Sequence, residues 1–79
     1  MSIVFNSKQE LTNHLEKFTL EEQKTELEFM ISKIEEEVEI ALIQNNNELA
    51  IWKMSIELLI EDVLKEVENK LIINYSLNV

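Results

Sequence analysis

The apolar residues of this chain recur at the spacing of an α-helix in two long segments. They form one stripe between residues 20 and 44 and a second stripe between residues 48 and 72. Stripes of this period predict two amphipathic helices of similar length. The first stripe holds Leu27, Met30, Ile31, Ile34, Val38, Ala41 and Leu42, and the second holds Leu49, Trp52, Ile56, Leu59, Ile60, Val63, Val67 and Leu71.

Two capping signals mark helix starts in a chain that contains neither glycine nor proline. The strings "SKQE", from Ser7 to Glu10, and "TLEE", from Thr19 to Glu22, each place a hydroxyl three residues before a glutamate. Both side chains can accept hydrogen bonds from amides that the first helical turn leaves unpaired. The second signal predicts the start of the first long helix, and the first predicts a short helix before it. The short helix has three apolar residues on one face, namely Leu11, Leu15 and Phe18.

The asparagine run "QNNN", residues 44–47, separates the two long stripes and allows two interpretations. At 100° per residue both stripes point in nearly the same direction, and apolar residues recur every eleven positions through the run, so the phase permits one continuous helix. Three asparagines inside a helix, however, cost about 2 kcal/mol relative to alanine. The string "NNNE", from Asn45 to Glu48, is also typical of a helix start, and asparagine tolerates the left-handed conformation that ends a helix. We therefore predict an antiparallel helical hairpin with arms of about 20–44 and 48–72.

The two ends of the chain have a different pattern. Residues 73–79, "INYSLNV", alternate strictly between apolar and polar, and residues 2–6, "SIVFN", are rich in β-branched and aromatic side chains. A period of two is typical of a half-buried strand. We therefore expect extended termini that are available for β-pairing with each other or with a second chain, and frayed tails are the alternative.

Length and charge describe a small acidic domain. The 79 residues form a single domain, 1–79, of a size at which one hydrophobic core supplies little net stability, so association is favoured. Sixteen acidic residues against seven lysines, with no arginine, give a formal net charge of −9. This charge repels nucleic acid and anionic membranes and attracts a basic partner protein. The chain has no apolar run long enough to span a bilayer and no basic start typical of a signal peptide, so we expect a cytoplasmic protein.

The sequence contains few of the residue combinations that catalyse reactions. The single histidine, His14, lies one turn after Glu10 and is half of a metal or acid–base site, so an exposed helical residue is the simpler interpretation. The absence of cysteine, glycine and arginine from the sequence leaves no thiolate, disulfide or phosphate-cradling loop. We therefore predict a protein that is not an enzyme and that holds no metal or cofactor.

Apolar residues that lie off the core stripe flank the asparagine run. A helix that is apolar on several faces is buried on several faces, so we expect a homodimer in which two hairpins form a four-helix bundle. The residues assigned to this contact are Ile40, Ile43, Ile51, Trp52, Met54 and Leu58. Trp52 also falls on the core stripe, so a core position is its first interpretation and a partner anchor is its second.

Acidic residues cluster on both arms, and a solvated surface is the simplest interpretation of them. The more specific hypothesis is that these acidic residues bind a basic protein surface, as the acidic residues of an inhibitor, antitoxin or immunity protein would. A second hypothesis is that they imitate the phosphates of a nucleic acid. The residues assigned to this surface are Glu35, Glu36, Glu37, Glu39, Glu57 and Glu61. The predicted function is therefore a non-catalytic protein–protein interaction module, and a helical homodimer with a purely structural role is the alternative.

Overall fold

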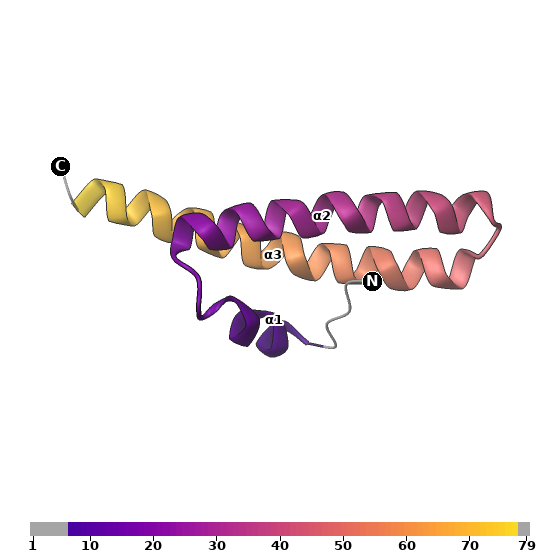
Figure 1. Cartoon of the computed structure of the whole chain (residues 1–79), viewed down its shortest axis with the longest axis horizontal. Coiled ribbons are helices and arrows are strands. Elements are labelled where there is room, and N and C mark those ends of the chain that lie inside the picture. The colour runs from indigo at the N-terminus through magenta and orange to yellow at the C-terminus, as the bar shows by residue number, and fades with distance from the viewer. Residues whose placement is uncertain (1–6, 78–79) are drawn as a thin grey trace.

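The computed structural model describes residues 7–77 of the chain, and within that range it contains helices and loops but no strand. The helices are α1 (Lys8–Leu15), α2 (Leu20–Ile43) and α3 (Asn47–Leu77). Helices α2 and α3 run side by side in opposite directions, and α1 lies against them near the open end of this hairpin (Figure 1). The predicted order of one short helix and a long hairpin is confirmed.

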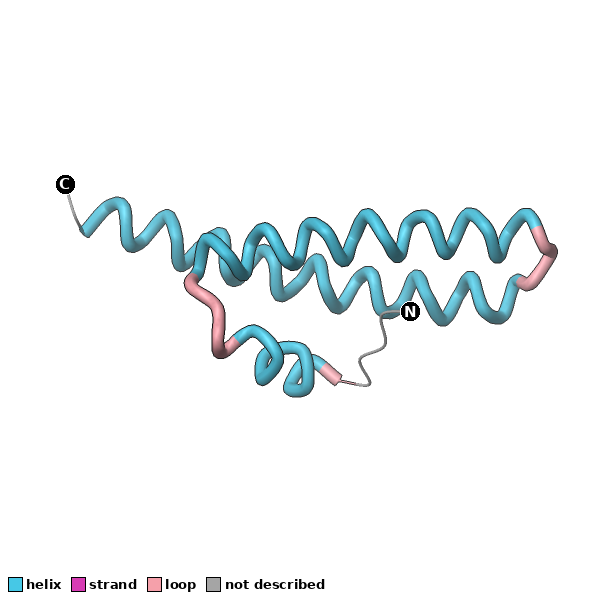
Figure 2. Tube along the Cα trace, in the orientation of Figure 1, coloured by secondary structure: helices cyan, strands magenta, loops and turns pink. Residues whose placement is uncertain are grey.

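The asparagine run forms the turn of the hairpin, which rules out the continuous helix (Figure 2). Asn45 has a φ of 58°, the left-handed conformation that glycine usually supplies at this position. The backbone N–H of Asn46 donates to the carbonyl of Ala41 at 2.8 Å, and that of Asn45 donates to the carbonyl of Leu42 at 3.0 Å. This pair of bonds is the Schellman pattern that closes a helix C-terminus. The side chain of Asn46 then accepts from the N–H of Leu49 at 3.3 Å, so Asn46 is the N-cap of α3.

Both capping signals act where the sequence places them. The hydroxyl of Ser7 accepts from the N–H of Glu10 at 3.3 Å. At the start of α2, the N–H of Glu22 donates to the hydroxyl of Thr19 at 3.2 Å, and the N–H of Thr19 donates to the Glu22 carboxylate at 3.0 Å. The backbone amide of Thr19, and next its hydroxyl, hold the pKa of the Glu22 carboxyl below its ordinary value.

The core lies along the seam between α2 and α3 and extends under α1. Its buried apolar side chains are Leu11 and Leu15 of α1, Leu27, Met30, Ile34, Val38 and Ala41 of α2, and Ala50, Ile56, Ile60, Val63 and Val67 of α3. The core interpretation of Trp52 is wrong, because this side chain is 44% exposed while its neighbour Lys53 is 4% exposed. Counting back from Ile60 in steps of four and three residues reaches Ile56 and Lys53, so position 52 lies beside the buried line.

The extended conformation expected for residues 73–79 is wrong as far as the structure describes them, because α3 continues to Leu77. A strand needs a partner for its backbone, whereas each residue added to an existing helix forms one further hydrogen bond within it. The alternation in residues 73–77 therefore does not outweigh the helix that precedes it. This end of α3 projects past the start of α2 (Figure 1). Residues 78–79 and the expected extended segment 2–6 lie outside the described range.

Candidate protein-interaction surfaces

Helices α2 and α3 each present two flanks beside the line of core residues. Because successive residues are rotated by 100°, the residue before a core residue lies on one flank and the residue after it lies on the other. Helix α1 contacts the flank formed by residues that precede core residues. Nε2 of His14 lies 3.9 Å from Oε1 of Glu26, and Lys8 pairs with Glu66. We call this side the covered flank.

The opposite side is called the open flank, and α1 does not reach it. On each helix its members directly follow buried residues of the core. They are Glu28, Ile31, Glu35, Glu39 and Leu42 of α2, and Glu57, Glu61, Leu64 and Glu68 of α3.

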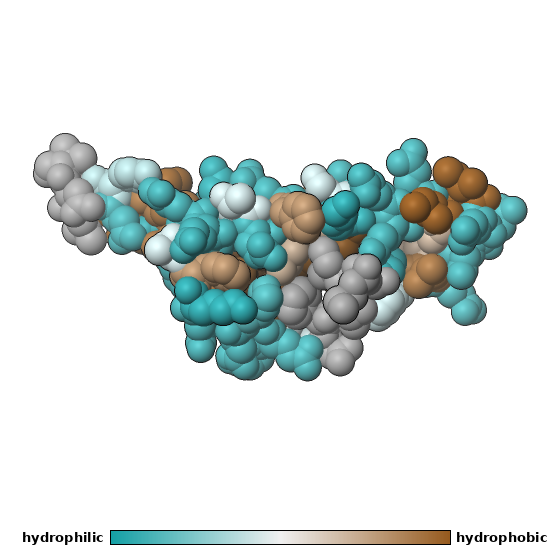
Figure 3. Space-filling model, viewed as in Figure 1, coloured by the Kyte–Doolittle hydropathy of each residue, from teal (hydrophilic) through white to brown (hydrophobic). Residues whose placement is uncertain are grey.

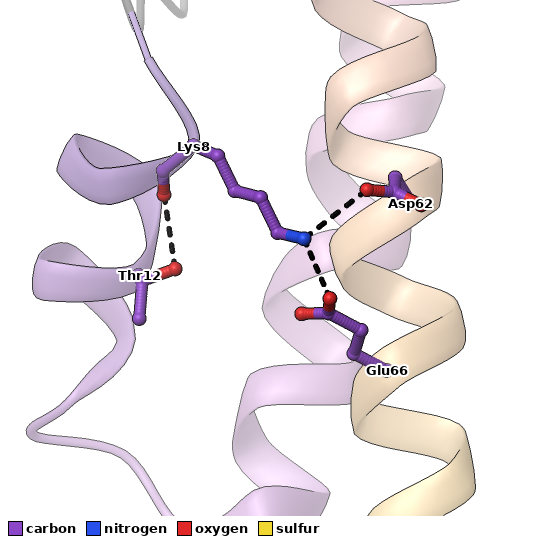
Figure 4. A network of polar contacts seen from close by, with 4 residues as sticks. All are labelled: Lys8, Thr12, Asp62 and Glu66. Carbon is purple, nitrogen blue, oxygen red and sulfur yellow. Dashed lines mark hydrogen bonds and ion pairs between the residues drawn. The ribbon is translucent and has the colours of Figure 1, made fainter.

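Polar contacts join α1 to the covered flank. The ammonium of Lys8 lies between two carboxylates of α3, 3.3 Å from Asp62 and closer to Glu66, while the hydroxyl of Thr12 donates to the Lys8 carbonyl (Figure 4). Hydrogen bonds to Glu66 and then to Asp62 raise the pKa of Lys8. All three paired side chains are 45–64% exposed, so these pairs fix geometry more than they add stability.

Gln23 of α2 holds the loop that follows α1. Its side-chain amide donates to the backbone carbonyl of Leu15 at 3.1 Å and to that of Phe18 at 3.0 Å. These carbonyls stand at the end of α1, where a helix leaves acceptors unsatisfied. The sequence offered no sign of this contact, because it depends on how α1 docks.

A buried ion pair lies farther along the covered flank. The ammonium of Lys53 is 2.7 Å from Oε2 of Glu37, and the exposed fractions of the two side chains are 5% and 26%. The same ammonium lies 5.1 Å from the centre of the Trp52 ring. Among the described residues no directional hydrogen bond reaches this Oε2 atom, so the ion pair is what compensates its burial. Glu37 therefore has an internal partner, which separates it from the other glutamates of the expected acidic surface.

Three of the six predicted acidic residues come together on the open flank. The carboxyl of Glu57 has a pKa above its ordinary value, first because it is partly buried and then because Glu35 and Glu61 place negative charge beside it. Glu39 is an exposed member of the same flank. Glu36 lies on the outer face of α2, where its carboxylate is 3.9 Å from Lys33. The structure thus divides the predicted acidic surface among three places.

The cluster around Glu57 predicts a pH-dependent effect of the variant Glu57→Gln. A raised folded-state pKa means that the folded protein binds this proton more tightly than the unfolded chain does. The charged carboxylate therefore destabilises the fold fully above the folded-state pKa, and the penalty disappears as the pH falls toward the ordinary value of 4.5. We expect Glu57→Gln to raise the free energy of unfolding by about 0.5 kcal/mol at neutral pH and to leave it unchanged in acid.

Urea unfolding followed by circular dichroism at both pH values measures this effect. Glu22→Gln is the control of opposite sign, because the lowered pKa of Glu22 stabilises the fold above 4.5 and that contribution is lost in acid. A destabilised Glu57→Gln protein at neutral pH would contradict the prediction.

The six residues predicted for self-association are all solvent-exposed, with exposed fractions between 42% for Met54 and 75% for Ile43. Apolar side chains gather at the closed end of the hairpin (Figure 3). Three of the six, Ile51, Met54 and Leu58, follow one another at helical spacing on the face of α3 that points away from α2, and we call them the outer stripe. Ile40 and Ile43 lie on α2, so the six residues form more than one surface.

The chain shows no match to a protein-family model, to a curated protein or to a solved structure. Within residues 7–77, no group of three or more histidine, aspartate or glutamate side chains has the arrangement of a metal site. None of the helices in that range is both long and apolar enough to cross a membrane. The functional argument accordingly rests on the surfaces themselves.

Proposed function

We propose that this chain is a non-catalytic protein–protein interaction module that forms a homodimer through the outer stripe of α3. The exposure of that stripe carries the proposal: Ile51, Met54 and Leu58 are 64%, 42% and 67% exposed, and nothing in the described chain covers them. Their spacing of three and then four residues is that of a helix face which packs on another helix. Association of this kind removes apolar surface from water, which is the main driving force of most interfaces.

Charge supports a second copy of the chain as the occupant. The outer face of α3 from Leu49 to Leu58 contains no charged side chain, because Lys53 is buried and Glu57 belongs to the open flank. Two copies that each carry a net charge of −9 repel one another across most of their surfaces. A neutral apolar face is where that repulsion is weakest.

An antiparallel contact between two α3 helices satisfies two-fold symmetry. In such a contact the same residues meet on both copies, and Ile51 of one copy faces Leu58 of the other. The two hairpins then contribute four long helices, as in the expected four-helix arrangement.

Sedimentation equilibrium from micromolar to several hundred micromolar tests the proposal. We expect the native sequence to form a dimer, and we expect only substitutions in the outer stripe to change its dissociation constant. Ile51→Glu should raise the dimer dissociation constant about tenfold or more. The matched control is Ile73→Glu, since Ile73 is 56% exposed near the far end of the same helix. A strictly monomeric native protein, or equal effects of the two variants, would refute dimerisation through the outer stripe.

A further inference from the structure

The groove between α2 and α3 on the open flank is lined by apolar side chains. Ile31 and Leu64 are half-buried there, and Leu42 is 48% exposed. On the covered flank, α1 fills the equivalent position between the same two helices. No helix of the described chain does so on the open flank, although its apolar residues continue for several turns.

The groove deepens toward the open end of the hairpin. A hollow of about 400 Å³ lies there, between the start of α2 and the end of α3. Its apolar lining comes from Leu71, Ile72 and Tyr75 of α3, and Tyr75 is tied to Glu21 by a hydrogen bond of 3.3 Å. The apolar side chains of the open flank are therefore concentrated between this hollow and the half-buried Ile31 and Leu64, and Leu42 is a separate apolar position near the turn.

Compensating charges are distributed unequally between the two flanks. The covered flank places a basic side chain beside each of its acidic residues that directly precedes a buried core residue: His14 beside Glu26, Lys53 beside Glu37, and Lys8 beside Asp62 and Glu66. The open flank carries six glutamates, and one lysine, Lys24, lies in the lining of the hollow together with Glu28 and Glu68. In the described part of the chain none of the six lies in an ion pair.

These glutamates flank the apolar side chains on both helices, and Glu35 and Glu57 approach one another between the helices. Glu28, Glu35 and Glu39 form the edge on α2, and Glu57, Glu61 and Glu68 form the edge on α3. The edge from Glu28 to Glu39 is roughly 16 Å long at 1.5 Å per residue, which corresponds to about three helical turns. An apolar floor between two acidic edges of this length is complementary to one kind of helix.

We infer that the open flank binds an amphipathic helix of a partner protein, with an apolar stripe against the groove and lysines or arginines along both sides of that stripe. The helix occupies the place that α1 occupies on the covered flank, and its cations meet the six glutamates. Helix-in-groove recognition of this kind uses apolar anchors for affinity and charge for orientation. The surface is distinct from the outer stripe, so this binding goes beyond dimerisation of the chain.

A synthetic peptide is a suitable probe. It consists of leucine and lysine, spans about four helical turns, and carries one leucine stripe bordered by lysines. Isothermal titration calorimetry at physiological ionic strength measures its affinity for the full chain, beside a scrambled peptide of identical composition. We expect the scrambled peptide to bind at least about tenfold more weakly, because it has the charge without the apolar stripe.

Two triple variants with equal loss of charge locate the binding. The test variant is Glu35→Gln, Glu57→Gln and Glu61→Gln on the open flank. The control variant is Glu16→Gln, Glu36→Gln and Glu48→Gln, three exposed residues away from that flank. Three exposed ion pairs together correspond to about one decade in affinity, so we expect the test variant to bind about tenfold more weakly and the control to change less than about twofold.

Chemical-shift mapping by NMR completes the experiment. Peptide-induced shifts are expected at Glu35, Leu42 and Leu64, and not in α1. The inference is overturned if both triple variants lose affinity equally, if the scrambled peptide binds as well as the ordered one, or if the shifts map to the covered flank. Sedimentation of the same samples reports dimerisation separately, so the failure of one proposal does not imply the failure of the other.

Discussion

Replacing Glu37 with alanine is expected to lower the free energy of unfolding by about 3 kcal/mol, the lower end of the range for breaking a buried ion pair. The variant leaves the ammonium of Lys53, whose side chain is only 5% exposed, without the carboxylate that lies 2.7 Å from it. An uncompensated charge inside the protein costs more than the lost attraction alone. The lower end of the range applies because the Glu37 side chain is 26% exposed and the site is partly hydrated.

Two further variants separate the charge effect from packing. Lys53→Met keeps most of the apolar stem and leaves Glu37 able to reach water, so a smaller loss of about 1 kcal/mol is expected. The double variant Glu37→Leu with Lys53→Met removes both charges, and its stability should return close to that of the native protein. Urea unfolding at neutral pH, followed by far-ultraviolet circular dichroism, gives all three values. If Glu37→Ala were no less stable than Lys53→Met, the ion pair would not be compensating a buried charge.

The hairpin could be predicted from the sequence, although the phase of the stripes did not decide it. Local chemistry did: Asn45 adopts the left-handed conformation and Asn46 caps the next helix, as asparagine does where glycine is missing. The capping pairs at Ser7 and Thr19 were equally readable, because they involve neighbours in the sequence. Structural features that depend on residues within one or two helical turns of each other can therefore be predicted from the sequence.

The burial of Lys53 could not be predicted from its residue type, because lysine is almost never fully buried unless it is paired. Its position nevertheless carried a signal. Lys53 lies three and seven residues before Ile56 and Ile60, on the buried line, and an antiparallel hairpin that turns at Asn45 places Glu37 opposite to it. Trp52 was given the core position instead, since a large aromatic side chain fits an apolar stripe better than a cation does.

The division of the acidic residues into flanks also required the structure. The sequence shows that glutamates are abundant, but it does not show which side of the hairpin α1 covers. Leu11 and Leu15 dock α1 on one side of the hairpin, so Glu37 lies on the covered flank and Glu35 lies on the open flank. The two glutamates are only two residues apart in the sequence. The candidate surface therefore depends on one short helix.

The second large effect is expected for Leu11→Ala, which should lower the free energy of unfolding by about 3 kcal/mol. Leu11 and Leu15 are the buried side chains of α1, 0% and 2% exposed, and they pack into the core below the covered flank. A helix of eight residues is not stable alone, so α1 persists only because these two leucines dock it. The ion pairs of Lys8 are too exposed to replace them.

Thr12→Ala is the matched control, because Thr12 lies on the same helix and is exposed. Its hydroxyl donates a hydrogen bond to the carbonyl of Lys8 within α1. Its effect should stay within about 0.5 kcal/mol. Urea unfolding measures both variants, and amide hydrogen exchange should show that Leu11→Ala releases α1 at a lower cost than it opens the hairpin. A loss below about 1 kcal/mol for Leu11→Ala would mean that α1 leaves the covered flank readily. In that case a partner helix could occupy either flank, because Glu26, Asp62 and Glu66 would lose their α1 partners as well.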